Sequence, residues 1–252
     1  MSFDVPADAY DRFMGVHSRQ LASQLADLAE LAPDGRALDV GCGPGALTTE
    51  LVARLAEGSV AAVDPSETFV AAARERHPGV DVQRATAEAL PYPDRDFDAA
   101  LAQLVVHFMT DPVAGIREMA RVTLPDGVVA ACVWDHAGER SPLAPFWQAA
   151  HELDIGVLDE SGLAGAREGH LVELFNAAGL RDVEQSELVA RVEYASVDDW
   201  LEPFAFGVGP AGAAYTGLDQ ERRAELDERC RELLGPPPFE LVSVAWAARG
   251  IV

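Results

Sequence analysis

The residues best suited to chemistry form one short run, Asp39-Val40-Gly41-Cys42-Gly43-Pro44-Gly45. Glycines are needed where the backbone turns tightly and approaches a ligand, because a side chain would stand in the way. Asp64 follows nineteen residues after the last glycine, at the end of a short apolar run. A carboxylate there can accept hydrogen bonds from ribose hydroxyls. Together these residues indicate a site for an adenosine-containing ligand, and a purely structural turn between a strand and a helix is the alternative.

The spacing leaves the kind of ligand open, because Gly41-x-Gly43-x-x-Ala46 also satisfies the relaxed dinucleotide fingerprint. Pro44 removes a backbone N–H at the start of the helix, where a pyrophosphate would need donors. Asp39 places a carboxylate beside the turn, where it would repel a phosphate and attract an ammonium group. The sequence contains no lysine, which removes Schiff-base chemistry and one common hydride-transfer apparatus. A cationic adenosine ligand without phosphate fits these residues better than a dinucleotide.

Two histidine positions are candidates for proton transfer to or from a substrate. His107 follows Gln103 by four residues, just beyond a predicted strand, and ligands of parallel sheets bind outside the carboxyl ends of the strands. An imidazole can deprotonate a hydroxyl or ammonium group near neutral pH, so we expect His107 to be the catalytic residue. Asp135-His136, after the next predicted strand, is the second candidate. The alternative for His107 is packing at a helix start, and we expect no metal because no HxxxH or CxxC spacing is present.

The elements that must position these residues alternate between strand and helix from residue 36 to about residue 134. This alternation predicts βαβ units with right-handed crossovers and a parallel sheet. The near-continuous apolar character of the strands agrees, because such sheets are covered on both faces. Five strands are predicted in this segment: 37–40, 59–63, one that starts at 80–82, then 97–102, and finally 128–134. The predicted helices run through residues 47–55, over residues 69–77 and from residues 111–112 onward.

The last hundred residues are less regular. A helix is predicted over 168–178, an extended segment over 182–194 and a final strand over 239–248. The segment between the last two, residues 195–237, is too long for a plain connection and is predicted to be a helical insertion that acts as a lid. Its aromatic residues, Trp200, Phe204, Phe206 and Tyr215, are candidates for lining an acceptor pocket, although most such residues belong to a core.

Composition limits the class of partner. The chain has 252 residues, 49% of them apolar, with 42 acidic residues, 19 basic residues and a net charge of −23. One α/β domain with a sizeable core suits this length, and so acidic a surface makes nucleic acid and anionic membranes poor partners. Cys42, Cys132 and Cys230 lie far apart and are predicted to be free thiols. No signal-peptide pattern or long apolar run is present, so we expect a cytoplasmic protein.

Four stretches carry a more specific signal: ALDVGCGPGALT (37–48), AVDPS (62–66), ATAEALPYPD (85–94) and FDAA (97–100). Occurring in this order, they resemble the class I S-adenosylmethionine-dependent methyltransferases, in particular the bacterial enzymes that act on small molecules. The resemblance covers roughly residues 8–135. It implies a single domain over 1–252, doubly wound and Rossmann-like, with a mostly parallel seven-stranded sheet, an antiparallel last strand and the helical insertion before that strand. Residues 1–30 would be a helical cap and residues 36–135 the cofactor-binding core.

The resemblance also implies roles for single residues. The glycines of the turn would lie against the methionine part of S-adenosylmethionine, Asp39 would hold its ammonium group, and Asp64 its ribose hydroxyls. Thr86 stands where many members have Asp, so the recognition of adenine N6 differs here. An N-terminal helix containing Tyr10 and Arg19 would close over the cofactor, with Arg19 on its carboxylate, although this helix could instead merely cap the sheet. The implied cofactor-binding residues are Tyr10, Arg19, Asp39, Gly41, Gly43, Gly45, Asp64, Pro65, Thr86, Ala87 and Gln103.

We therefore predict a cytoplasmic S-adenosylmethionine-dependent methyltransferase, monomeric or homodimeric, that methylates oxygen or nitrogen, with carbon as a further option, on a small organic acceptor. The Asn/Asp-Pro-Pro-Tyr tetrapeptide that marks methylation of nucleobase amines is absent after the fourth strand, where Ala102-Gln103-Leu104-Val105 stands instead. Two alternatives stay open. One is a nicotinamide-dependent oxidoreductase, and the other is a non-catalytic protein that binds S-adenosylmethionine.

Overall fold

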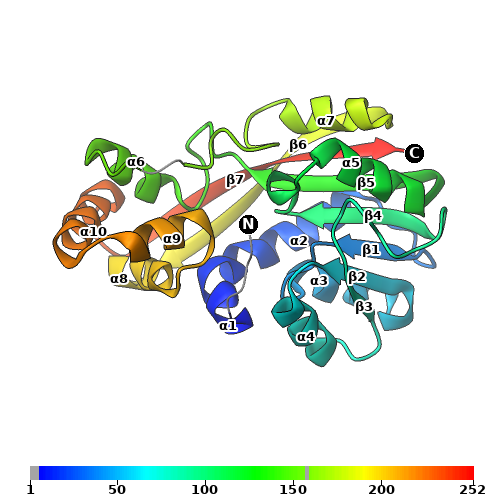
Figure 1. The fold of residues 1–252 in the computed structure, drawn as a ribbon, viewed down its shortest axis with the longest axis horizontal. Helices are drawn as coiled ribbons and strands as arrows, with labels where there is room; N and C mark the ends of the chain where they lie inside the picture. The colour runs from blue at the N-terminus through cyan, green and yellow to red at the C-terminus, as the bar shows by residue number, and fades with distance from the viewer. Residues whose placement is uncertain (1–5, 157–158) are drawn as a thin grey trace.

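The computed structural model describes residues 6–156 and 159–252, and its centre is a seven-stranded sheet in the order β3-β2-β1-β4-β5-β7-β6 (Figure 1). Strands β1 to β5 pair in parallel, and β7 pairs antiparallel with both β5 and β6. The predicted doubly wound α/β sheet with an antiparallel last strand is confirmed. The strands are β1 (Ala37–Val40), β2 (Val60–Asp64), β3 (Asp81–Arg84), β4 (Phe97–Gln103), β5 (Thr123–Trp134), β6 (Arg181–Tyr194) and β7 (Phe239–Ile251).

The helices that connect these strands begin where the sequence places capping residues. Ser66 precedes α4 (Glu67–Arg76), and its side chain accepts a hydrogen bond from the N–H of Phe69. Asp111 caps α5 (Pro112–Val122) in the same way, with a proline in the first turn. Such oxygens satisfy backbone donors that have no partner inside the helix. The other helices around the sheet are α2 (Val16–Leu28), α3 (Ala46–Leu55) and α7 (His170–Ala178).

The core lies on both faces of the sheet. Successive residues of a strand point to opposite faces, so in β4 Leu101 packs in one apolar cluster and Ala100 and Ala102 pack in the other. Helices α2, α3 and α4 contribute to the first cluster, and α5 and α7 contribute to the second. All four positions of β1 are buried. Burial on both faces explains why the parallel strands are almost continuously apolar.

A helical end extends the molecule beyond the parallel strands (Figure 1). Within the part of the chain that the structure describes, the outer part of β7 pairs with β6 alone, because the register between β5 and β7 ends at the pair Trp134 and Ala245. As predicted, helices occupy the segment before the last strand: α8 (Val197–Leu201), a 3-10 turn (Glu202–Phe206), α9 (Gly209–Gly217) and α10 (Gln220–Leu234), with α6 (Ala144–Glu152) packed against α10.

The N-terminal helix lies between the helical end and the parallel strands (Figure 1). It starts as α1 (Ala7–Tyr10), passes through a π-helical turn (Asp11–Gly15) and continues as α2. Strand β5 also differs from its predicted bounds, because the Pro125-Asp126-Gly127 turn lies inside the strand as an irregularity between two paired sections. Among the described helices, none is long and apolar enough to cross a membrane.

Candidate active site

The glycine-rich turn follows β1 and crosses the end of β2. The N–H groups of Gly41 and Cys42 both donate to the Val63 carbonyl, at 2.8 and 2.9 Å. Gly41 has a φ of +73°, and a Cβ added there would lie 2.4 Å from a methyl carbon of Val105. Only glycine fits this position, because a side chain would meet both the backbone strain and the clash. Gly45, with a φ of +98°, then precedes α3 as its N-cap residue.

Asp64 ends β2 and ties the turn to this strand. One carboxylate oxygen accepts from the N–H of Gly43 at 2.9 Å, and the other accepts from the N–H of Ser66 at 2.8 Å. Burial raises the pKa of Asp64, and these two hydrogen bonds lower it in part. Each carboxylate oxygen can accept a further hydrogen bond. Asp64 can therefore hold the turn and bind ligand hydroxyls at the same time.

Two buried oxygen atoms near the turn have no hydrogen-bond partner among the described residues. Asp39 is 1% exposed, and while its Oδ2 accepts from the Thr48 hydroxyl at 2.6 Å, its Oδ1 is one of these two atoms. Burial raises the pKa of Asp39 to about 7. Gln103 donates from Nε2 to the Ser18 carbonyl at 3.0 Å, and its Oε1 is the other atom. Because buried acceptors are normally satisfied, these oxygens fit a ligand that brings N–H donors.

A cavity of about 250 Å³ opens beside the turn. It brings together six of the predicted cofactor-binding residues, namely Tyr10, Gly41, Gly43, Asp64, Pro65 and Gln103. The cavity is also lined by residues that the sequence reasoning missed: Ser66, Phe69, Leu104, Val105 and Phe108. Their only signal in the sequence is their place directly after the ends of β2 and β4. Tyr10 and Phe69 form an edge-to-face pair with ring centres 5.3 Å apart, so the N-terminal helix closes one side.

The other predicted cofactor residues do not line this cavity. Asp39 and Gly45 lie in the turn region but outside the lining. Arg19 is exposed and lines a separate cavity together with Asp11 and Arg76. On the segment after β3, Thr86 is exposed and Ala87 is buried, and neither reaches the cavity.

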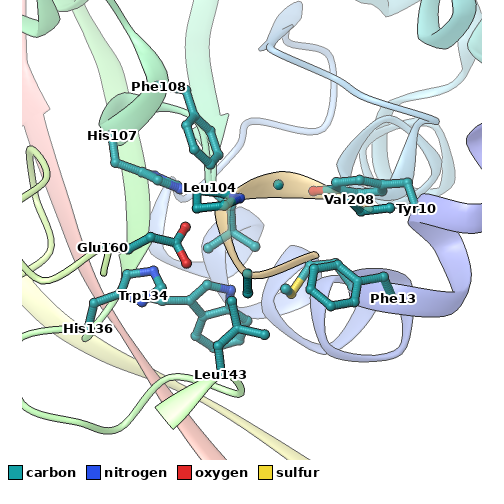
Figure 2. Close-up of a pocket in the computed structure, with 14 residues that line it drawn as sticks. Tyr10, Phe13, Leu104, His107, Phe108, Trp134, His136, Leu143, Glu160 and Val208 are labelled. Atoms are coloured by element: carbon teal, nitrogen blue, oxygen red, sulfur yellow. The ribbon is translucent and has the colours of Figure 1, made fainter. Parts of the chain in front are cut away.

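A second, smaller cavity of about 40 Å³ adjoins the first and shares Tyr10, Leu104 and Phe108 with it (Figure 2). His107, the predicted catalytic residue, lines this second cavity, in a short 3-10 turn after β4. The rest of its wall is mostly apolar. Phe13 and Met14 come from the N-terminal helix, Trp134 ends β5 and Leu143 precedes α6. The helical insertion contributes Val208, Gly209, Pro210 and Ala211.

The polar side of the second cavity consists of His107, His136 and Glu160, which point toward one another (Figure 2). Burial lowers the pKa of His107, with a further contribution from nearby His136, and burial lowers the pKa of His136 to about 4. Both imidazoles are therefore neutral at neutral pH and present lone pairs. Burial raises the pKa of Glu160 to about 7, although its Oε2 accepts from the Trp147 indole N–H at 3.2 Å.

Asp135, predicted together with His136 as the second proton-transfer candidate, does not line the second cavity. Its carboxylate pairs with Arg140 at 2.6 Å and accepts from the N–H of Gly138 at 2.9 Å. Asp135 thus stabilises the loop after β5. Only His136 of this pair faces the cavity.

Comparisons with known proteins agree with this geometry. Residues 38–131 match the family model described as a methyltransferase domain. The chain is 35% identical over 133 residues to a malonyl-[acyl-carrier protein] O-methyltransferase of Halorhodospira halophila, covering 51% of this chain and 45% of that protein. It is 33% identical to a trans-aconitate 2-methyltransferase of Methylobacterium nodulans, covering 55% and 53%. The chain thus spans about half the length of these relatives.

Solved structures share the fold along nearly the whole chain. A Haloferax volcanii protein, solved in complex with the methyltransferase activator Trm112, superimposes with a TM-score of 0.63 at 18% identity, covering 97% of this chain and 94% of that one. The sheet order, the glycine-rich turn and the match of residues 38–131 to a methyltransferase domain are all similar to those of the class I S-adenosylmethionine-dependent methyltransferases.

Proposed function

We propose that this protein binds S-adenosylmethionine in the larger cavity and methylates a small organic acceptor held in the smaller one. The observation that carries the proposal is that the two cavities are adjacent, with Tyr10, Leu104 and Phe108 lining both. The larger cavity is built from the glycine-rich turn and Asp64, whereas the smaller is mostly apolar and contains His107. When bound, S-adenosylmethionine supplies an electrophilic methyl group on its sulfonium sulfur.

Different residues in and around the larger cavity would bind different parts of this cofactor. Asp64 would accept hydrogen bonds from the ribose hydroxyls beside Pro65, while Gly41 and Gly43 leave space for the ligand. Asp39 Oδ1 and Gln103 Oε1, which lack donors among the described residues, would accept from its ammonium group. Tyr10 would cover the cofactor from the N-terminal helix. Gly45 would contact the methionine part, Thr86 and Ala87 the adenine edge, and Arg19 the carboxylate. These four residues and Asp39 lie outside the cavity lining, so their contacts would need a local change on binding.

The protein would align the acceptor atom with the methyl group. Where that atom carries a proton, the protein would also remove it. Displacement at a methyl group needs an in-line approach, and the departing thioether needs no acid. We assign the proton-accepting role to His107, which lines the smaller cavity. The insertion 195–237 would act as a lid, because Val208, Gly209, Pro210 and Ala211 form part of the cavity wall.

The apolar wall favours a small acceptor of low charge that is methylated on oxygen, nitrogen or carbon. The net charge of −23 argues against nucleic acid and anionic membranes as partners. The three cysteines are free thiols, which supports a cytoplasmic protein. A monomer or a homodimer is part of the same proposal.

The test is calorimetric titration with S-adenosylhomocysteine, run beside NAD and NADP. We expect micromolar binding of S-adenosylhomocysteine alone, about −8 kcal/mol. Binding of a dinucleotide instead would support an oxidoreductase and overturn the proposal. An acceptor screen then compares the wild-type protein with His107→Ala, which should turn over more slowly at unchanged S-adenosylhomocysteine affinity. Cofactor binding without turnover of any acceptor would support a non-catalytic binding protein.

A further inference from the structure

We infer that His107, His136 and Glu160 form a binding site for one divalent transition-metal ion. This site lies on the polar side of the smaller cavity, so its use in catalysis rests on the proposed function, although metal binding itself does not. While the ion is bound, His107 is a ligand and does not act as the proton acceptor, because a neutral imidazole has one lone pair. The three residues come from separate segments: the turn after β4, the loop after β5 and the loop before α7. The sequence showed no metal motif because no two of these residues are close along the chain.

The geometry fits a single ion. One ligand atom from each residue lies within 4.8 Å of the other two. Metal–ligand bonds of about 2.0–2.2 Å place the ligand atoms of a tetrahedral ion roughly 3.3–3.6 Å apart. Side-chain movements of about 1–1.5 Å would therefore close the three residues around an ion.

The polar atoms of this cluster lack the partners that buried groups normally have. The three residues are between 3% and 7% exposed. His107 Nδ1 and both ring nitrogens of His136 have no hydrogen-bond partner within the described parts of the chain. An unsatisfied buried polar atom costs about 1–3 kcal/mol. Ring nitrogens without partners on two neighbouring buried histidines are expected where an ion completes the arrangement.

A hydrogen bond from a helix holds the Glu160 carboxylate in place. Glu160 Oε2 accepts a hydrogen bond from the Trp147 indole N–H at 3.2 Å, and Trp147 lies on α6. Residues that orient a metal ligand in this way are typical of metal sites. Glu160 thus has an anchor on one side and the two imidazoles on the other.

The ligand set indicates the class of metal. Two neutral imidazoles and one carboxylate suit Zn²⁺, Fe²⁺, Co²⁺ or Ni²⁺, whereas Mg²⁺ and Ca²⁺ prefer sites made only of oxygen. Three protein ligands leave at least one coordination position open, as in catalytic metal sites. That position faces the cavity of about 40 Å³, which has room for a few water molecules. An acceptor oxygen or nitrogen would occupy the same position once the insertion opens.

The experiment uses the 252-residue chain, freed of metal with a chelator and titrated with Co²⁺ while its visible absorption is followed. We expect one equivalent to bind, Zn²⁺ to displace it and Mg²⁺ to leave it in place. His136→Gln and Glu160→Gln should each weaken binding by about 100-fold or more, since even outer partners of a metal ligand contribute 10–100-fold. His170→Gln, which removes a histidine on α7 away from the cavity, is the matched control and should bind normally.

S-adenosylhomocysteine titration of every variant separates the possible failures. Normal S-adenosylhomocysteine binding by a variant shows that it is folded, so its loss of Co²⁺ binding can be attributed to the site. The inference is overturned if the metal-free wild type binds no stoichiometric Co²⁺ or Zn²⁺. It is also overturned if folded His136→Gln and Glu160→Gln bind metal as tightly as His170→Gln does. If the wild type binds Co²⁺ but does not bind S-adenosylhomocysteine, the proposed function is refuted and the metal site stands.

Discussion

Raising the pH through neutrality should tighten the binding of S-adenosylhomocysteine, and Asp39 should be the group responsible. Burial raises the pKa of this carboxyl to about 7, so much of the free protein carries it protonated at neutral pH. An ammonium group binds the ionised form. Because binding favours the charged state, the ligand must remove the proton from Asp39 whenever the solution pH lies below its pKa.

The size of the effect follows from this pKa. With a pKa of about 7, roughly one molecule in eleven has an ionised Asp39 at pH 6, and roughly ten in eleven have one at pH 8. The dissociation constant should therefore fall about ten-fold between these pH values, which corresponds to about 1.4 kcal/mol. The ligand's own ammonium group stays protonated over this range, so it adds little to the change.

Calorimetric titrations at several pH values, in buffers of different ionisation enthalpy, measure both the affinity and the proton released on binding. Asp39→Asn should bind weakly with no pH slope from this source. Asp34→Asn, which changes an exposed carboxyl in the loop before β1, is the control and should keep the wild-type slope. A wild-type affinity that does not change between pH 6 and pH 8, or a full slope in Asp39→Asn, would refute the assignment of Asp39 as the ammonium partner.

Three further changes test other parts of the structure. Asp64→Ala should weaken S-adenosylhomocysteine binding by about 1.5–3 kcal/mol, because hydrogen bonds to a charged acceptor are lost; unchanged affinity in calorimetry would contradict the ribose assignment. Gly41→Ala should lower the free energy of unfolding by about 2–4 kcal/mol, through the clash with Val105 and the positive φ, and adding Val105→Ala should recover much of this loss in urea unfolding. His17 has its pKa lowered by burial to about 4, so its contribution to stability is present above pH 6.5 and is lost as the pH falls toward 4, by up to about 3 kcal/mol. In His17→Gln this part of the pH dependence should disappear, and identical curves for both proteins would disprove it.

Much of the fold could be predicted because it depends on local patterns. The alternation of apolar strands and helices, with Ser66 and Asp111 as helix caps, required a parallel sheet with helices on both faces. The position of β5 was less accessible, because the Pro125-Asp126-Gly127 turn usually ends a strand, whereas pairing with β4 and β7 continues the strand on both sides of it.

The residues of the larger cavity also divide into those that local sequence patterns could predict and those that such patterns could not. Gly41, Gly43 and Asp64 were visible because a tight turn and a strand end are read from neighbouring residues. Arg19 and Thr86 were placed by resemblance, yet their side chains are exposed and lie outside the cavity. Side-chain direction depends on how helices pack against the sheet, and a short motif does not contain that information.

Local sequence rules thus account for the glycine-rich turn, the strand-ending carboxylate and the parallel sheet that carries them, since each depends on residues within a few positions. The meeting of His107, His136 and Glu160 depends on two other facts. Strands β4 and β5 are neighbours in the sheet, and the loop before α7 returns to their ends. Both result from the packing of segments distant in the chain, where burial and chain connectivity act over the whole domain. No residue spacing in the sequence indicates that these three side chains meet.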